Sequence, residues 1–124
     1  MTILKIEPGK SPRTEEIKGD LKSMQSVVGG YIQAIYPFEE SIALICNEEG
    51  KLLNLPFNRA LTMDGKIYDI VCGTFFLCSA PLHSDAFESL NEEQIRIYTN
   101  HFMAPEVILQ TDRGLVILKT SKES

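Results

Sequence analysis

Apolar and polar residues alternate with the two-residue period of a β-strand along most of the chain. The alternation is clear at the start, where Leu4 and Ile6 share one face and Lys5 lies on the other. Segments rich in β-branched, aromatic or alternating residues predict further strands at 13–19, 31–38, 41–47, 66–72, 73–80, 106–110 and 115–119. The composition of 66–72 and 73–80 favours the centre of a sheet.

Two other segments have the 3.6-residue period of an α-helix. The first, residues 20–30, begins at the N-cap residue Asp20 and ends at a glycine pair. Its predicted buried face consists of Leu21, Met24, Val27 and Val28. The second, residues 91–102, begins with a capping box of Asn91 and Gln94. Its predicted buried stripe consists of Ile95, Tyr98 and Phe102.

Three stretches have the composition of tight turns. NEEG at 47–50 and TDRG at 111–114 share one order, with a polar first residue and a final glycine suited to left-handed backbone. We expect each to be a hairpin loop between the strands that flank it, and Asp64-Gly65 to form another tight turn. Pro56 argues against a central strand, so residues 55–61 are expected to be irregular.

These elements predict an α+β fold, with a mainly antiparallel, curved sheet built from β-hairpins and covered by two helices. The chain has 124 residues and shows no repeat or linker, so we expect a single domain over 1–124. A frayed polar tail is expected at 121–124. The composition, 44% hydrophobic and 23% charged, excludes a disordered or fibrous protein.

Charge and hydropathy narrow the range of partners. The formal net charge is −5 and the basic residues are scattered, so we expect no direct binding to nucleic acid. The start of the chain lacks the basic and apolar regions of a signal peptide. No apolar run approaches the ~18 residues of a membrane-spanning helix, so we expect a cytoplasmic protein without membrane association.

Few residues suggest catalytic or metal chemistry. Cys46, Cys72 and Cys78 lie in apolar runs without CxxC spacing, and we expect buried, reduced thiols. His83 and His101 belong to no metal-binding motif, so neither a metal nor another cofactor is expected. No nucleophile or phosphate-binding motif is present. Whether the protein is an enzyme is left open, with the balance toward a non-enzymatic role.

Asn58-Arg59 allows two interpretations. Arg59 lies among apolar residues and must find acceptors for its five N–H donors. In the first, Arg59 donates to backbone carbonyls or a carboxylate of the protein and so anchors its segment. In the second, its guanidinium group binds an external anion. In the second case we expect Tyr31, Asn47, Asn58 and Arg59 to bind an anionic metabolite or nucleotide.

Several motifs together resemble one known family. They are IEPGK, VGGYI after a short helix, NEEGK followed by LPFNR, and FESLNEEQIRIY, which lie between Ile6 and about Pro105. With them the chain resembles the bacterial and phage family catalogued as domain of unknown function 3846. The resemblance implies a short protein encoded on a phage, plasmid or integrated mobile element. It implies no catalytic residue.

Taken together, these features predict an accessory protein that binds a still unknown protein partner. Tyr31, Tyr36 and Phe38 lie on or near predicted edge strands and are candidate contacts. Because an exposed strand edge can also pair with a second copy, a homodimer is a further prediction. The alternative is the small-ligand module that uses Asn58 and Arg59.

Overall fold

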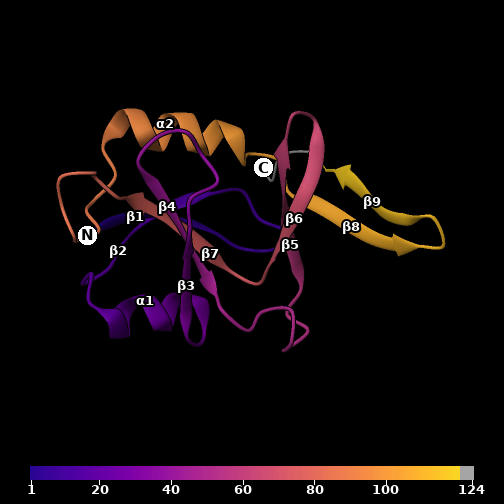
Figure 1. Cartoon of the computed structure of the whole chain (residues 1–124), viewed down its shortest axis with the longest axis horizontal. Coiled ribbons are helices and arrows are strands. Elements are labelled where there is room, and N and C mark those ends of the chain that lie inside the picture. Colours follow the sequence, from indigo (N-terminus) through magenta and orange to yellow (C-terminus); the bar gives the residue numbers. More distant parts are fainter. Residues whose placement is uncertain (121–124) are drawn as a thin grey trace.

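The computed structural model describes residues 1–120, and within them the fold is α+β, with two helices and nine strands (Figure 1). The predicted polar tail at 121–124 lies outside these residues. The elements are β1 (Thr2–Ile6), β2 (Arg13–Glu16), α1 (Leu21–Val28), β3 (Ile32–Ile35), β4 (Ile42–Asn47), β5 (Phe57–Met63), β6 (Lys66–Cys72), β7 (Phe75–Ser79), α2 (Glu92–His101), β8 (Glu106–Thr111) and β9 (Gly114–Lys119). The predicted fold class is therefore confirmed. Within the described part of the chain, no helix is long and apolar enough to span a membrane.

Five strands form one antiparallel sheet in the order β2-β1-β7-β4-β3. Strand β7 lies at its centre, and every residue of the neighbouring β4 is buried. Strands β2 and β3 form its two edges. The other four strands form two antiparallel ribbons, β5–β6 and β8–β9. The central position predicted for 73–80 is thus confirmed, whereas β6 belongs to a separate ribbon.

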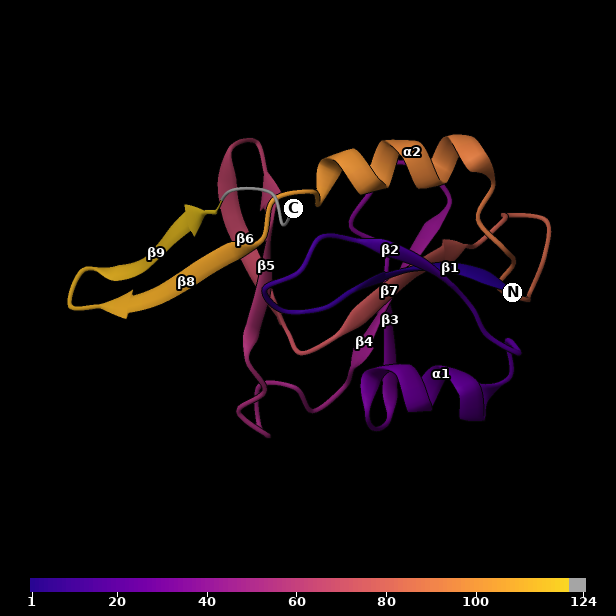
Figure 2. The ribbon, with the colours of Figure 1, turned by 180° about the vertical axis from the view of Figure 1, so that it is seen from behind.

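The helices cover opposite faces of the five-stranded sheet (Figures 1 and 2). On one face, Met24 and Val28 of α1 pack against the apolar side chains of β1, β4 and β7. On the other face, Tyr98 of α2 and Phe102, the C-cap residue of this helix, pack with residues of the sheet and of the β5–β6 ribbon. Leu21, predicted to be buried, is 56% exposed because it lies in the first turn of α1, beyond the sheet contact.

The prediction of a hairpin loop at 47–50 is wrong. Strand β4 pairs with β3 and β7, while β5 pairs with β6, so this turn leads from one sheet to another. Gly50 does not have a positive φ. A Cβ on Gly50 would instead lie 2.9 Å from the carbonyl oxygen of Cys72, so glycine is required for close approach.

The prediction of an irregular segment at 55–61 is also wrong, because strand β5 begins at Phe57. Pro56 lies directly before the strand, where its missing N–H removes no ladder bond. The register shifts between Phe57 and Arg59, which leaves Asn58 in a β-bulge. Sequence composition gave no indication of a bulged strand here.

The two other predicted turns are confirmed as hairpin loops. Asp64 and Gly65 both have positive φ, 53° and 77°, which is typical of the type I′ turn that joins β5 and β6. The loop between β8 and β9 leads into Gly114, the first residue of β9, which has φ 110°. This ribbon projects beyond the rest of the fold (Figure 1). Four apolar residues on one of its faces are each between 41% and 52% exposed, namely Val107, Leu109, Val116 and Leu118.

Candidate functional site

Strand β3 has an open edge, because it pairs with β4 on one side only. The Glu48 N–H donates to the Tyr31 carbonyl at 2.8 Å, which extends the β3–β4 ladder by one pair. Hydrogen-bonded pairs alternate along an antiparallel ladder, so Gln33 directs its backbone groups toward β4. The N–H and C=O groups of Ile32 and Ala34 therefore face the open side. We call this side of Ile32–Ile35 the β3 edge.

An exposed tyrosine stands at each end of the β3 edge. Tyr31 is 66% exposed and borders a hollow of about 240 Å³, which Gln25 of α1 and Leu53 also line. Tyr36 is 61% exposed and lies between two hollows of about 430 and 270 Å³. Phe38 lines the larger of these hollows, and the centroid of its ring lies 4.8 Å from that of the Tyr98 ring in α2. Aromatic side chains of this kind often anchor protein interfaces.

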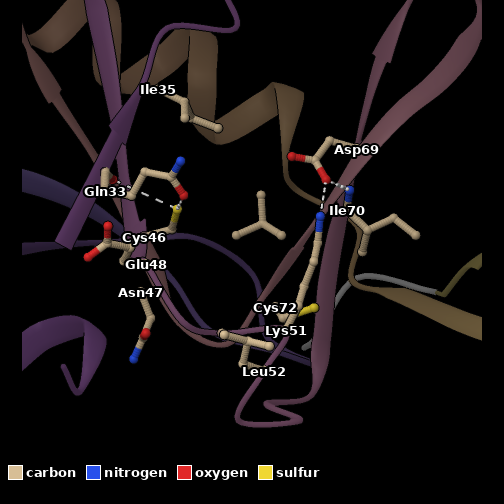
Figure 3. Close-up of a pocket in the computed structure, with 12 residues that line it drawn as sticks. Gln33, Ile35, Cys46, Asn47, Glu48, Lys51, Leu52, Asp69, Ile70 and Cys72 are labelled. Atoms are coloured by element: carbon tan, nitrogen blue, oxygen red, sulfur yellow. Dashed lines mark hydrogen bonds and ion pairs between the residues drawn. The ribbon is translucent and has the colours of Figure 1, made fainter. Parts of the chain in front are cut away.

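A central cavity of about 130 Å³ separates β3 and β4 from β6 (Figure 3). Gln33, Ile35 and Cys46 line it from β3 and β4, whereas Asp69, Ile70 and Cys72 line it from β6. The cavity shares Ile35 and Asp69 with the larger hollow beside Tyr36, so the two lie next to each other.

The edge of β6 that faces this cavity is blocked. Asp69 accepts a hydrogen bond from the Ile70 N–H at 2.8 Å and forms an ion pair with Lys51 (Figure 3). The hydrogen bond with Asp69 raises the pKa of Lys51, because it stabilises the charged ammonium form. At the next outward-facing position, Gly50 packs against the Cys72 carbonyl. The first contact satisfies the Ile70 N–H and the second shields the Cys72 carbonyl, so both hinder pairing with another strand.

The three cysteines are buried and free, as predicted. Burial raises the pKa of Cys46 to about 11 and that of Cys78 to about 12, and it also raises the pKa of Cys72. A thiol nucleophile needs a lowered pKa, so these groups are not activated. Within residues 1–120, no three His, Cys, Asp or Glu side chains gather in a group that could hold a metal ion.

We expect the thiols of the folded protein to resist modification at pH 7.5. Because burial disfavours each thiolate and limits access, reaction with a coloured disulfide reagent should be at least about a hundredfold slower than in urea. The measurement is the absorbance change in native and unfolded protein. Rapid loss of one thiol in the native state would contradict this assignment, and a Cys72→Ser variant would show whether the thiol that borders β6 is responsible.

Arg59 is completely buried, and all five of its N–H donors have acceptors within the chain. Nη2 donates to the carbonyls of Lys10 (2.6 Å) and Phe102 (3.0 Å), and Nε donates to Phe102 (3.4 Å). Nη1 donates to the Asn58 side chain (2.8 Å) and carbonyl (3.4 Å). Burial lowers the pKa of Arg59, an effect that the Glu106 carboxylate opposes. No carboxylate within residues 1–120 forms an ion pair with it.

Asn58 and Arg59 together connect four parts of the fold. Asn58 Nδ2 donates to the carbonyls of Ile6 and Gly73, at 2.9 and 2.8 Å. Arg59 satisfies the Phe102 carbonyl at the C-terminal end of α2, where backbone acceptors lack partners within the helix. These hydrogen bonds are those expected if Asn58 and Arg59 anchor their segment within the fold.

The four residues of the predicted ligand site lie at two separate places. Tyr31 and Asn47 border the hollow near α1, where Asn47 Nδ2 donates to the Val28 carbonyl at 3.2 Å. Asn58 and Arg59 are buried beneath the C-terminal end of α2. Ligand binding by this set stays a prediction. Sequence reasoning missed Gln33, Lys51 and Asp69, because no local pattern links residues that meet only through folding.

A family model described as domain of unknown function (DUF3846) matches residues 1–103. No curated protein and no solved structure was found to match the chain. The matched region contains the five-stranded sheet and both helices and ends before the β8–β9 ribbon.

Proposed function

The chain belongs to the family described as domain of unknown function (DUF3846), and for this member we propose a non-enzymatic, protein-binding role. The partner contributes an extended segment, which adds to the five-stranded sheet at the β3 edge. In this proposal the chain works as a single cytoplasmic domain, an accessory protein of a phage or another mobile element. The observation that carries the proposal is the unblocked backbone of Ile32 and Ala34 between two exposed tyrosines.

A comparison of the strand edges supports this location. The edge of β6 is blocked by Asp69 and by the turn at Gly50. The other sheet edge, β2, has the sequence RTEE, and charged side chains discourage strand addition. At β3, by contrast, no side chain within residues 1–120 bonds to the outward backbone groups of Ile32 or Ala34. Of the two edges of the five-stranded sheet, β3 is therefore the better template for a further strand.

The hollows beside β3 supply places for side chains. Successive side chains of an added strand point to opposite faces of the sheet. Gln25 of α1 lines the hollow at Tyr31. Phe87 lines the smaller hollow at Tyr36 and packs on the core beneath α1, so both hollows lie on the α1 side of the sheet. The central cavity and the larger hollow at Tyr36 lie on the α2 side. In strand addition, backbone bonds provide affinity and such pockets provide specificity.

Proline substitution on the two sheet edges tests the proposal. Peptides are first selected from a random library against the native protein. We expect Ala34→Pro to weaken their binding at least about tenfold, because proline removes one outward donor and its ring obstructs the edge. Thr14→Pro is the matched control on β2. The Ile17 N–H donates to the Met1 carbonyl, and hydrogen-bonded pairs alternate along the β1–β2 ladder, so the backbone groups of Thr14 point away from β1. This substitution should leave binding unchanged.

Two outcomes would contradict this role. One is that no peptide is enriched, and the other is that selected peptides bind Ala34→Pro as well as the native protein. Circular dichroism establishes that both proline variants are folded. If Ala34→Pro does not fold, amide chemical shifts of Ile32 and Ala34 in the native protein provide an independent measurement, because these two signals must move when a strand is added.

A further inference from the structure

Building on the proposed function, we infer that the partner segment is cationic, with lysine or arginine residues flanking apolar ones. The inference comes from the charges around the β3 edge. Five carboxylate groups line the four hollows described above, and they belong to Glu39, Glu48, Glu49, Asp69 and Asp85. Within residues 1–120, Lys51 is the one lysine or arginine that lines them.

The ammonium group of Lys51 does not offset the remaining acids. It already forms an ion pair with Asp69 inside the central cavity. Glu39, Glu48, Glu49 and Asp85 form no ion pair with any residue of the described chain. These four carboxylates carry uncompensated negative charge beside the backbone groups that would receive a partner.

Acidic residues elsewhere are paired more often. Glu7, Glu15 and Glu16 of the β1–β2 region form ion pairs with Arg13, Lys5 and the N-terminal ammonium group. Asp20, the N-cap of α1, forms an ion pair with Lys18, and Glu93 in the first turn of α2 forms one with Arg96. Since the formal charge of the whole chain is −5, much of its excess lies around the β3 edge. Such a region attracts cationic partners and repels phosphate groups.

The positions of the acids predict where the positive charges lie on the partner. Glu48 and Glu49 follow β4 at the Tyr31 end, whereas Glu39 and Asp85 line the hollows at the Tyr36 end. The four residues of β3 span roughly 13 Å, so a matching segment places its basic residues about four to six positions apart. The exposed tyrosine rings can also contact lysine or arginine through cation–π interactions.

A set of three synthetic peptides tests the charge preference. Each peptide has a core of five alternating valine and threonine residues with one further residue at each end. Both end residues are lysine in the first peptide, glutamine in the second and glutamate in the third. We expect the lysine peptide to bind at least about tenfold more tightly than the glutamate peptide at 50 mM salt, with glutamine intermediate. The difference should shrink at 500 mM salt, because exposed charges are screened.

Charge-removing variants locate the effect on the protein. The double variant Glu48→Gln/Glu49→Gln should lower the affinity for the lysine peptide about fivefold and leave that for the glutamine peptide unchanged. Glu15→Gln/Glu16→Gln removes the same charge at the opposite sheet edge and serves as the matched control. It should not change either affinity.

The outcomes separate this inference from the function on which it rests. Equal binding of all three peptides, lost in Ala34→Pro, overturns the cationic partner but retains strand addition. Binding that Ala34→Pro does not weaken, or no binding by any peptide, overturns both. Self-association that Ala34→Pro abolishes, measured by analytical ultracentrifugation, assigns the edge to a second copy and also overturns the cationic partner.

Discussion

Arg59→Ala is expected to destabilise the protein by about 3–5 kcal/mol. The substitution removes the donors that serve the Lys10 and Phe102 carbonyls and leaves a void in the core. Because a domain of this size is stable by only about 5–15 kcal/mol, a large fraction of its free energy of unfolding is lost. Urea and thermal denaturation followed by circular dichroism measure the change.

The same variant separates the two interpretations of Arg59. If the arginine served mainly to bind an anion, Arg59→Ala would have nearly native stability and would lose any thermal shift caused by that anion. Arg96→Ala is the control, because Arg96 is exposed and forms only a surface ion pair with Glu93. Its unfolding midpoint should stay close to that of the native protein. A stable Arg59→Ala protein would contradict the structural role.

Gly73→Ala is expected to cost about 2–4 kcal/mol, for two combined reasons. Gly73 has φ 83°, where side chains are strained, and an added Cβ would lie 2.8 Å from Leu55 Cδ1 and 3.3 Å from Leu55 Cβ. Rotation of Leu55 could relieve the first contact but not the second. The Gly73 backbone cannot easily move, because its N–H donates to Pro56 and its carbonyl accepts from Asn58.

Gly65→Ala provides the matched control for this prediction. Gly65 also has a positive φ, 77°, but no atom lies within 4 Å of the added Cβ. Only the conformational strain remains, so we expect a loss of about 1 kcal/mol. The difference between the urea midpoints measures the close approach of Leu55 to the β6–β7 connection. Equal midpoints would mean that this packing is loose.

The sequence by itself determined the local elements, because their signals come from residues a few positions apart. The Asp20 side chain accepts from the Ser23 N–H at the start of α1, and the Asn91–Gln94 capping box begins α2. Asp64-Gly65 predicted a hairpin because few residues tolerate positive φ. The alternation of apolar residues likewise predicted the strands and hence the α+β class.

Only the tertiary structure decided how these elements meet. NEEG has the composition of a hairpin loop, yet β4 pairs with other strands, since burial of its two apolar faces outweighs the local turn. The acceptors of Arg59 are equally distant, at Lys10 and Phe102. The β3 edge also depends on strand order. Contacts between residues forty or more positions apart leave no local period in a sequence, so the candidate site appeared only after the strands were placed.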